Sequence, residues 1–156
     1  MDKPPRGTVA SLHVHPAKSG EPLLAVESVN LAEGKGILED TRFFGRKPRR
    51  QVTLVEREQL AAHADALGIG EIAPGAARSN IETTGIDLRR LIGRHVRIGE
   101  TVLKLDKPRT PCHKMDLISY GLRELMENGR QGVLALVVKG GAIRVGDAVV
   151  PEVNDE

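Results

Sequence analysis

The sequence has few aromatic residues, and their scarcity disfavours one class of function. Its 156 residues include one tyrosine, two phenylalanines and no tryptophan, so aromatic side chains make up 2% of the chain. Proteins that bind single-stranded nucleic acid usually stack the bases on several aromatic side chains. Nucleic acid is therefore not an expected partner.

Cysteine is equally scarce, and long hydrophobic runs are missing. The single cysteine, Cys112, cannot form a disulfide within the chain, which favours a reducing compartment. No apolar run approaches the roughly 20 residues that a membrane helix requires, and no apolar segment of a secretion signal follows residues 1–5. We therefore expect a cytoplasmic protein that does not contact a membrane.

The composition is otherwise typical of one globular domain. Hydrophobic residues make up 40% and charged residues 28% of the chain, and 156 residues are enough for a single core. The net charge is only +2, but the basic residues are clustered, and such clusters indicate the kind of partner better than the total does. We expect a single domain over residues 1–156, with its core over about 7–151 and short termini.

Most of the chain consists of short runs rich in β-branched residues, which predicts strands joined by glycine turns. Two stretches, 96–102 and 143–149, share the pattern apolar-Arg-apolar-Gly-acid-x-Val, and each predicts a β-hairpin. Apolar residues at helical spacing predict helices near 57–67 and 116–128. The expected fold is mainly β: a small closed or nearly closed barrel with glycine-turned hairpins and two or three short helices. The other expected strands cover residues 8–14, 24–31, 51–55 and 133–138.

The surroundings of Cys112 indicate a reactive thiol. It lies in a proline-stiffened segment with three fixed cations and a histidine, just before the second expected helix, whose N-terminal end carries partial positive charge. These features favour the thiolate, which is the form that attacks electrophiles or binds soft metals. The alternative is a buried and inert side chain, the commonest fate of a lone cysteine. The segment is Lys107-Pro108-Arg109-Thr110-Pro111-Cys112-His113-Lys114.

Two further groups of residues could bind an anion. The first is the basic stretch from Arg42 to Arg50, where Arg49 and Arg50 directly precede a strand, so that one of them is expected to face inward. The second combines Arg78 with Asn80, which lie on the same side of an extended segment. Arginine offers paired donors to phosphate. The alternatives are a solvated loop for the first group and a plain turn with a surface arginine for the second.

The histidines do not have the spacing of a zinc site. His13 and His15 are two residues apart on an expected strand, His63 lies on an amphipathic helix, and His95 begins a strand. We expect structural or surface roles for these four. Only His113, beside the cysteine, is a candidate for the site.

In their order along the chain, these elements resemble the MOSC family, the domain named after the C-terminus of molybdenum-cofactor sulfurase. The resemblance covers about residues 7–151. One departure is Glu39, where the family has a glycine immediately before the aspartate that corresponds to Asp40. The elements that carry the resemblance are Gly36-Ile37 with Asp40 and Arg42, Arg50-Gln51-Val52-Thr53-Leu54, Arg78-Ser79-Asn80-Ile81 with Gly85-Ile86, Arg109-Thr110-Pro111-Cys112, and Gly132-Val133 through Gly141 to Gly146-Asp147.

Members of this family carry sulfur on the cysteine as a persulfide, or bind a pyranopterin molybdenum cofactor (molybdopterin) with the cysteine as a metal ligand. Free-standing bacterial relatives reduce N-hydroxylated compounds. The resemblance implies that Cys112 ligates molybdenum and that cations such as Lys18, Arg49 and Arg78 hold the phosphate of the cofactor. It implies that Asn80 lies near the metal or the pterin. The remaining candidates for the site are Arg42, Thr110, His113 and Lys114.

The resemblance also implies partners. A small-molecule substrate and an electron-donor protein are expected, because nothing in the sequence resembles a flavin, haem or iron–sulfur site. Pyridoxal phosphate is not expected, since the chain has no aminotransferase-like half. One alternative is a sulfur carrier that a desulfurase supplies and that holds no metal. Another is a non-enzymatic basic module that binds an anionic partner through residues 42–50. For the cofactor-binding function, Lys18, Arg49 and Arg78 should converge on one cavity with Cys112.

Overall fold

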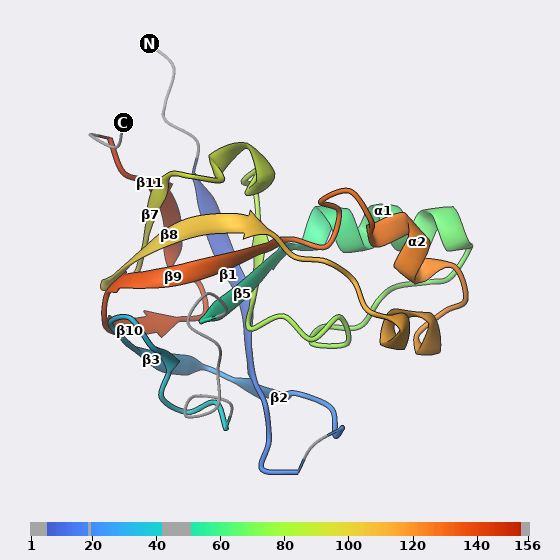
Figure 1. The fold of residues 1–156 in the computed structure, drawn as a ribbon, viewed down its shortest axis with the longest axis horizontal. Helices are drawn as coiled ribbons and strands as arrows, with labels where there is room; N and C mark the ends of the chain where they lie inside the picture. The colour runs from blue at the N-terminus through green and yellow to red at the C-terminus, as the bar shows by residue number, and fades with distance from the viewer. Residues whose placement is uncertain (1–5, 19, 42–50, 154–156) are drawn as a thin grey trace.

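The computed structural model describes residues 6–18, 20–41 and 51–153. They form mainly β-structure with a few short helices, as the sequence predicts (Figure 1). The strands are β1 Gly7–Val14, β2 Leu24–Val26, β3 Ser28–Ala32, β4 Gly36–Ile37, β5 Val52–Glu56, β6 Ile81–Thr84, β7 His95–Ile98, β8 Thr101–Pro108, β9 Val133–Lys139, β10 Gly141–Arg144 and β11 Ala148–Pro151. The helices are α1 Arg57–Leu67 and α2 Leu122–Met126, with the 3₁₀ helices η1 Arg89–Leu91 and η2 His113–Leu117.

Seven of the described strands form a closed barrel. Their order around it is β11-β7-β8-β9-β5-β6-β1, and pairing between β1 and β11 closes the ring. β2 lies outside the ring, paired with β1, while β3, β4 and β10 form a smaller sheet. The expected barrel fold is therefore confirmed, and closure leaves β1 and β11 without an open edge where they pair.

A bulge in β1 lets this strand line the interior of the barrel over its whole length. Val9 and Leu12 are three residues apart, so a regular strand would place them on opposite faces. The pairing with β6 shifts by one residue between Val9 and Ser11, which restores the alternation and buries both side chains in the main core. The same shift turns Ser11 and His13 toward the outer face.

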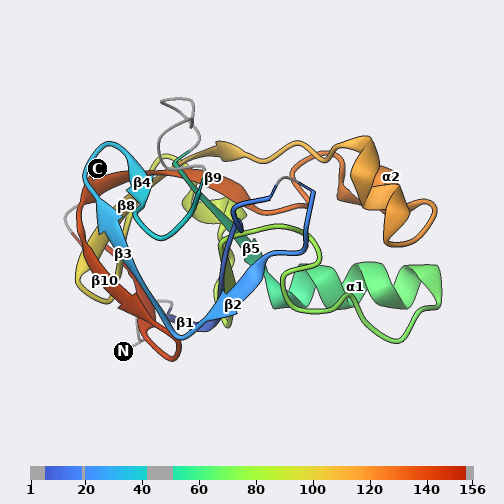
Figure 2. The same ribbon diagram turned by 90° about the horizontal axis from the view of Figure 1, so that it is seen from below.

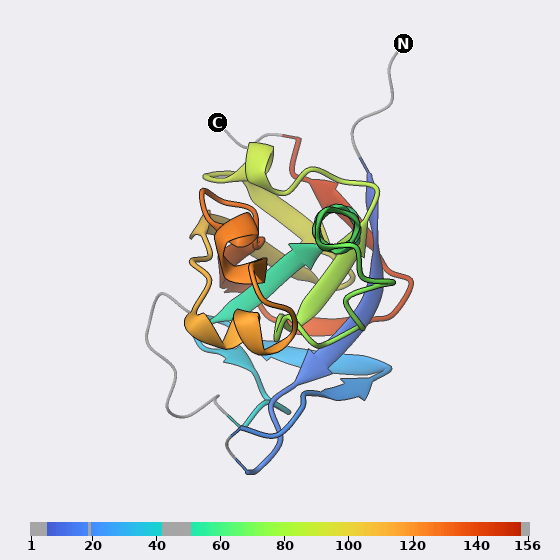
Figure 3. The same ribbon diagram turned by 90° about the vertical axis from the view of Figure 1, so that its right-hand side faces the viewer.

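A second, smaller core lies on the outside of the barrel. Val55 of β5 packs there with Leu60 and Ala64 of α1, and Leu122 and Met126 of α2 complete it. Figure 2 shows α1 and α2 side by side at one end of the molecule, with β3, β4 and β10 at the other. Figure 3 shows α1 end-on, beside the orange segment that carries η2 and α2. β5 is buried on both faces because it separates the two cores.

The crossover from β5 through α1 to β6 brings two polar segments together. β5 and β6 are parallel, and a connection of this kind needs a helix or a long loop. α1 covers residues 57–67 as the sequence predicts and ends at Gly68, whose φ of 69° gives the left-handed helix cap. The chain then returns through residues 70–79, the expected loop, so that Asn80 lies beside Thr53 of β5.

The last residue of β5, Glu56, makes stability depend on pH. Burial and then the Asp87 carboxylate raise its pKa, a hydrogen bond from the Leu88 backbone lowers it, and Glu58 raises it further, to about 7 in all. Because this value lies above the ordinary 4.5, ionisation of Glu56 opposes folding. The free energy of unfolding should therefore lose up to about 3 kcal/mol from this group as pH rises from 4.5 to about 7, and stay lowered above that.

A Glu56→Gln variant isolates this contribution. Its stability relative to wild type should increase between about pH 5 and about pH 8 in urea unfolding, since only the wild type must ionise a buried carboxyl group. Glu124→Gln, which removes an exposed carboxylate, is the control and should follow the wild type at both pH values. A stability difference between Glu56→Gln and wild type that does not change with pH would contradict the prediction.

The helix expected over 116–128 is divided in two, which corrects the sequence prediction. Gly121 has a φ of 95° between η2 and α2, and a left-handed residue ends the helical path. Asp116 does not begin a long helix. Its Oδ1 accepts hydrogen bonds from the backbone N–H groups of Gly121 and Arg123, at 3.2 and 3.0 Å, and so caps α2. Only η2, of five residues, directly follows Cys112.

One of the two expected hairpins is also wrong. Residues 96–102 do form a hairpin, with Ile98 paired with Thr101 around Gly99 and Glu100. Residues 143–149 do not, because β10 pairs with β3 while β11 pairs with β7 and β1. Their Gly-acid turn instead carries the chain from the small sheet to the barrel. The strand expected over 24–31 is similarly divided between β2 and β3, which pair with different strands.

Candidate functional site

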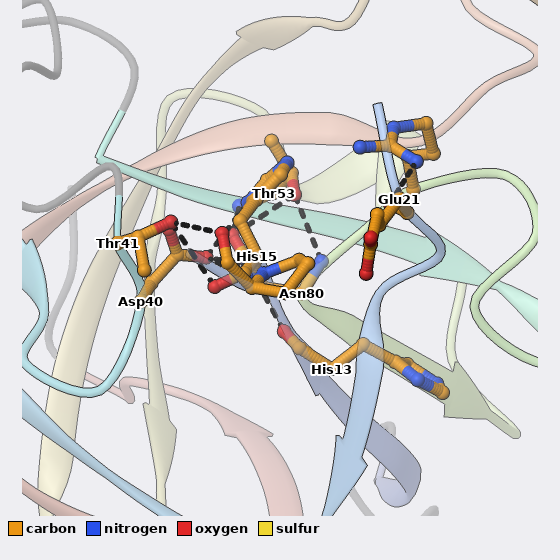
Figure 4. Close-up of polar contacts among 9 residues, drawn as sticks. His13, His15, Glu21, Asp40, Thr41, Thr53 and Asn80 are labelled. Carbon is orange, nitrogen blue, oxygen red and sulfur yellow. Dashed lines mark hydrogen bonds and ion pairs between the residues drawn. The ribbon is translucent and has the colours of Figure 1, made fainter. Parts of the chain in front are cut away.

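Asn80 is the buried centre of a hydrogen-bond network beneath the candidate site (Figure 4). Its Oδ1 accepts hydrogen bonds from the backbone N–H and the hydroxyl of Thr53, both at 3.1 Å. Its Nδ2 donates to the backbone oxygen of His13 and to Oδ2 of Asp40, also at 3.1 Å. Both lone pairs and both hydrogens of the amide are thus used. Direct contact between Asn80 and a cofactor stays a prediction, and the structure gives the side chain a positioning role.

Replacing Asn80 by alanine should destabilise the protein by about 2–3 kcal/mol, because it leaves several buried polar groups without a partner. Urea unfolding would measure the loss. Asn30→Ala is the control: this side chain is exposed, and its removal should cost less than about 1 kcal/mol. Equal denaturation midpoints for Asn80→Ala and wild type would contradict the assigned role.

Asp40 connects this network to His15. Its buried carboxylate accepts hydrogen bonds from the backbone N–H of His15 at 3.0 Å and from the ring Nδ1 at 2.8 Å. A proton held on Nδ1 leaves Nε2 as the second ring nitrogen for a ligand. The departure at Glu39 is accommodated locally, since its carboxylate accepts hydrogen bonds from the backbone and the side-chain amide of Asn30. Asp40 reaches the network although no glycine precedes it.

His15 opens onto a hollow that also contains two of the predicted phosphate-binding cations. The hollow measures about 190 Å³, and His15, Lys18, Thr41 and Arg78 are among the residues that line it. Arg78 has a φ of 63°, a left-handed conformation that costs a non-glycine residue about 1 kcal/mol. Its Nη1 donates to the backbone oxygen of Glu21 at 3.1 Å. The structure therefore places Lys18 and Arg78 at the same hollow, which is one part of the convergence that the resemblance implies.

The other predicted site residues lie elsewhere or outside the described residues. Cys112 is an exposed, free thiol and does not line the hollow that contains Lys18 and Arg78. The expected convergence of these cations on one cavity with Cys112 is therefore wrong, because the cysteine precedes η2 on the surface. It immediately precedes η2, where its backbone oxygen accepts a hydrogen bond from the N–H of Met115. Its exposure excludes a buried side chain, and the reactivity of the thiol stays a prediction. Thr110, His113 and Lys114 flank the cysteine and are exposed, whereas Arg42 and Arg49 lie outside the described residues.

Arg109 connects the cysteine segment to the segment of Arg78. The sequence suggested that its charge stabilises the thiolate. Instead its Nη1 donates to the backbone oxygen of Ala77 at 3.2 Å and to Oγ of Ser79 at 2.9 Å, and the residue is buried. These acceptors stand on either side of Arg78 in the chain. The guanidinium therefore joins the approach to Cys112 to the wall of the hollow.

His13 and His63 are structural, as expected from the sequence. His13 is buried beside Glu82, whose carboxylate forms an ion pair with Arg57 at 3.0 Å. Burial lowers the pKa of His13, Glu82 raises it, and Arg57 lowers it again, with a net decrease. His63 shares a hydrogen bond of 2.7 Å with the backbone oxygen of Arg130.

His15 is the residue that sequence reasoning missed. Its partner Asp40 lies 25 residues further along the chain. The spacing of His13 and His15 gave no sign that His13 is buried while His15, just after β1, lines a hollow. The signal that could have found it is the early Asp40 element itself, because a buried carboxylate requires a partner. Among the described residues, no group of three His, Cys, Asp or Glu side chains could hold a metal ion. No helix in the described ranges is long and apolar enough to span a membrane.

Comparison with known proteins identifies the family of the chain. The model of the MOSC domain matches residues 40–150, more than half of the chain. The chain belongs to the MOSC family. No curated protein matches it.

Several solved structures resemble this MOSC protein. The YuaD protein of Bacillus subtilis is 21% identical, with a TM-score of 0.80 over 96% of this chain and 97% of that one. YiiM from Geobacillus stearothermophilus is 18% identical, with a TM-score of 0.76 over 94% and 75% of the two chains. YiiM from Escherichia coli is 24% identical, with a TM-score of 0.71 over 96% and 70%. At these identities the likeness demonstrates a shared fold.

Proposed function

We propose that this MOSC protein binds a pyranopterin molybdenum cofactor and, with it, reduces N-hydroxylated compounds in the cytoplasm. The observation that carries the proposal is the hollow shared by Lys18, Arg78 and His15, tied through Arg109 to the segment of Cys112. The family is associated with this cofactor. The types of residue present suit its phosphate group and its metal.

The fit can be assessed on the chemistry of the donors. A phosphate requires cations and hydrogen-bond donors in a partly enclosed place, and Lys18, Arg78 and Thr41 provide them in the hollow. Arg42 and Arg49 are proposed to add to this group. A soft metal requires a soft ligand, and the exposed thiol of Cys112 is accessible for that role. Bound there, the cofactor would supply two-electron oxygen-transfer chemistry.

The residues of the chain would bind and orient the cofactor and the substrate, and they would move protons. Asp40 holds the His15 ring with its Nδ1 protonated, so Nε2 can donate to an anion when the ring is charged or accept a proton when it is neutral. Asn80 keeps Asp40 in place. Thr110, His113 and Lys114 would surround the substrate beside Cys112. An electron-donor protein would supply the reducing equivalents.

The proposal is tested on protein purified from a host that makes the cofactor. Metal analysis should find molybdenum, and denaturation should release oxidised pterin with its characteristic fluorescence. The same protein from a host that lacks cofactor synthesis is the control and should contain neither. Wild-type protein without molybdenum and without pterin in both hosts, but with its native fold, would contradict cofactor binding.

A second function is favoured by the exposure of Cys112 outside the hollow. An accessible thiol with room around it could hold a persulfide that a desulfurase supplies and another protein receives. Intact-mass measurement after incubation with a desulfurase and cysteine would detect the added sulfur on Cys112. The third alternative, a basic binding module, depends on residues 42–50 and lies outside the described residues.

A further inference from the structure

A second hollow lies beside the cysteine segment, and four of the ten residues that line it are cations. It measures about 730 Å³, several times the volume of the hollow at Lys18 and Arg78. Residues from the end of β8, from η1 and from the segment around α2 line it. The lining residues on which the argument depends are Arg89, Lys107, Arg109, Pro111, Arg123 and Glu127.

The exposed cations of this hollow are not neutralised by the protein. Arg89, Lys107 and Arg123 come from three separate segments, and among the described residues none of their side chains forms an ion pair or a hydrogen bond. Glu127 is the single carboxylate in the lining. Like charges repel one another, so placing three of them around one concave surface disfavours the empty state and favours an anion inside.

The neighbouring residue Arg90 shows the contrast. It belongs to the same 3₁₀ helix as Arg89, but its Nε lies 3.5 Å from the carboxylate of Asp87, and it does not line the hollow. Arg89 instead lies across Gly129, where a β-carbon would approach its Nε to 3.1 Å and its Cζ to 3.3 Å. Gly129 has a φ of 82°, which a glycine adopts without strain, and its lack of a β-carbon leaves room for the side chain of Arg89. The exposed guanidinium of Arg89 thus lies close against the backbone of Gly129.

We propose that this hollow is a second binding site, for a small molecule that carries a carboxylate or a phosphate. Arg89 and Arg123 would bind the anionic group, because guanidinium offers paired donors to both kinds of anion. Proline side chains of the cysteine segment line the same space and give an apolar body something to pack against. A volume of about 730 Å³ suits a ligand larger than free phosphate.

The position of the site connects it with the chemistry of the protein. Pro111 lines the hollow, and Cys112 is the next residue in the chain. A ligand bound there lies beside the cysteine segment, and no residue that lines this hollow also lines the one at Lys18 and Arg78. The site suits an anionic substrate or effector, and its existence does not depend on cofactor binding.

The test is a titration of ¹⁵N-labelled protein followed by NMR, with pyrophosphate in one arm and glutarate in the other. The expected result is saturable shifts of the amides of Lys107, Thr110 and Gly129. Arg89→Gln and Arg123→Gln should each raise the dissociation constant about tenfold, the effect of one charge-assisted contact. Arg90→Gln is the matched control and should change it less than about twofold. The spectrum of each variant also reports that the fold is intact.

The two arms identify the anion that the site prefers, and either preference supports the proposal. Shifts that do not saturate, or that weaken equally in Arg90→Gln, would indicate diffuse surface electrostatics and overturn it. Shifts confined to Ala17, Gly20 and Arg78 would place all anion binding in the first hollow and also overturn it. Because the readout uses no metal and no activity, failure of the cofactor proposal would leave this result unchanged.

Discussion

A Cys112→Ser variant is expected to fold like the wild type and to lose molybdenum completely. Serine keeps the size of the side chain but replaces a soft, easily ionised sulfur with a hard oxygen. The free energy of unfolding should change by less than about 1 kcal/mol, because Cys112 is exposed and serine is a preferred residue at the N-cap of a helix, the position that Cys112 occupies before η2. Metal analysis of protein from a cofactor-competent host, together with thermal unfolding, measures both parts.

Ser79→Ala is a useful comparison, since it removes one acceptor of Arg109 and leaves the thiol in place. It should retain part of the molybdenum, whereas Cys112→Ser should retain none. Reduction of an N-hydroxylated compound, or persulfide formation if the protein carries sulfur, should follow the same order. A Cys112→Ser protein that unfolds would indicate a packing role for the cysteine. One that folds and keeps its molybdenum would mean that another residue is the ligand.

A Gly132→Ala variant is expected to lose more than about 4 kcal/mol of stability, enough to unfold many domains of this size. Gly132 has a φ of 81°, and a β-carbon there would overlap the carbonyl oxygen of Leu54 and lie 2.8 Å from Cα of Val55. Both of those atoms belong to the backbone of the central strand β5, which cannot move aside. The Gly132 carbonyl also accepts the N–H of Arg109, so the cysteine segment would shift as well.

Gly68→Ala separates the steric cost from the conformational cost. Gly68 also has a positive φ, 69°, but a β-carbon there would meet no atom within 4 Å. Its replacement should cost about 1 kcal/mol from backbone strain alone. Urea or thermal unfolding of the two variants measures the difference. A Gly132→Ala protein that is as stable as Gly68→Ala would contradict the close approach of Gly132 to the backbone of β5.

Local patterns predicted the elements of the fold but not all of their pairings. The first helix and its end at Gly68 are determined by neighbouring residues, and the sequence predicted both correctly. The pattern shared by 96–102 and 143–149 determines a tight turn, yet the two turns connect differently paired strands. Pairing depends on which edges the rest of the chain leaves open. The second expected helix is wrong because Gly121, inside its range, takes a left-handed conformation that interrupts the helical path.

The candidate site was predictable in its residues and less so in their contacts. Lys18 and Arg78 were named from the sequence and share a hollow. The contacts of Arg109 were not predicted from the sequence. A cation three residues from a thiol can equally turn toward another loop, here the one that contains Ser79. Asn80 shows the same limit: its type suits a ligand, and only the folded structure reveals that four protein groups already occupy its amide.

The pairing of Gly7 with Val149 determines when this barrel can be completed. On the ribosome, β1 is made first and must wait for β11 while the rest of the chain is synthesised. Until then, β1 and β7 each present an unpaired edge that another nascent chain could join. Contacts between such distant residues have a high loop-closure cost, so folding is slow compared with that of a helical domain of the same length. The ring can therefore close only when β11 is available, and until then those two edges are the part of the sheet most open to wrong pairing.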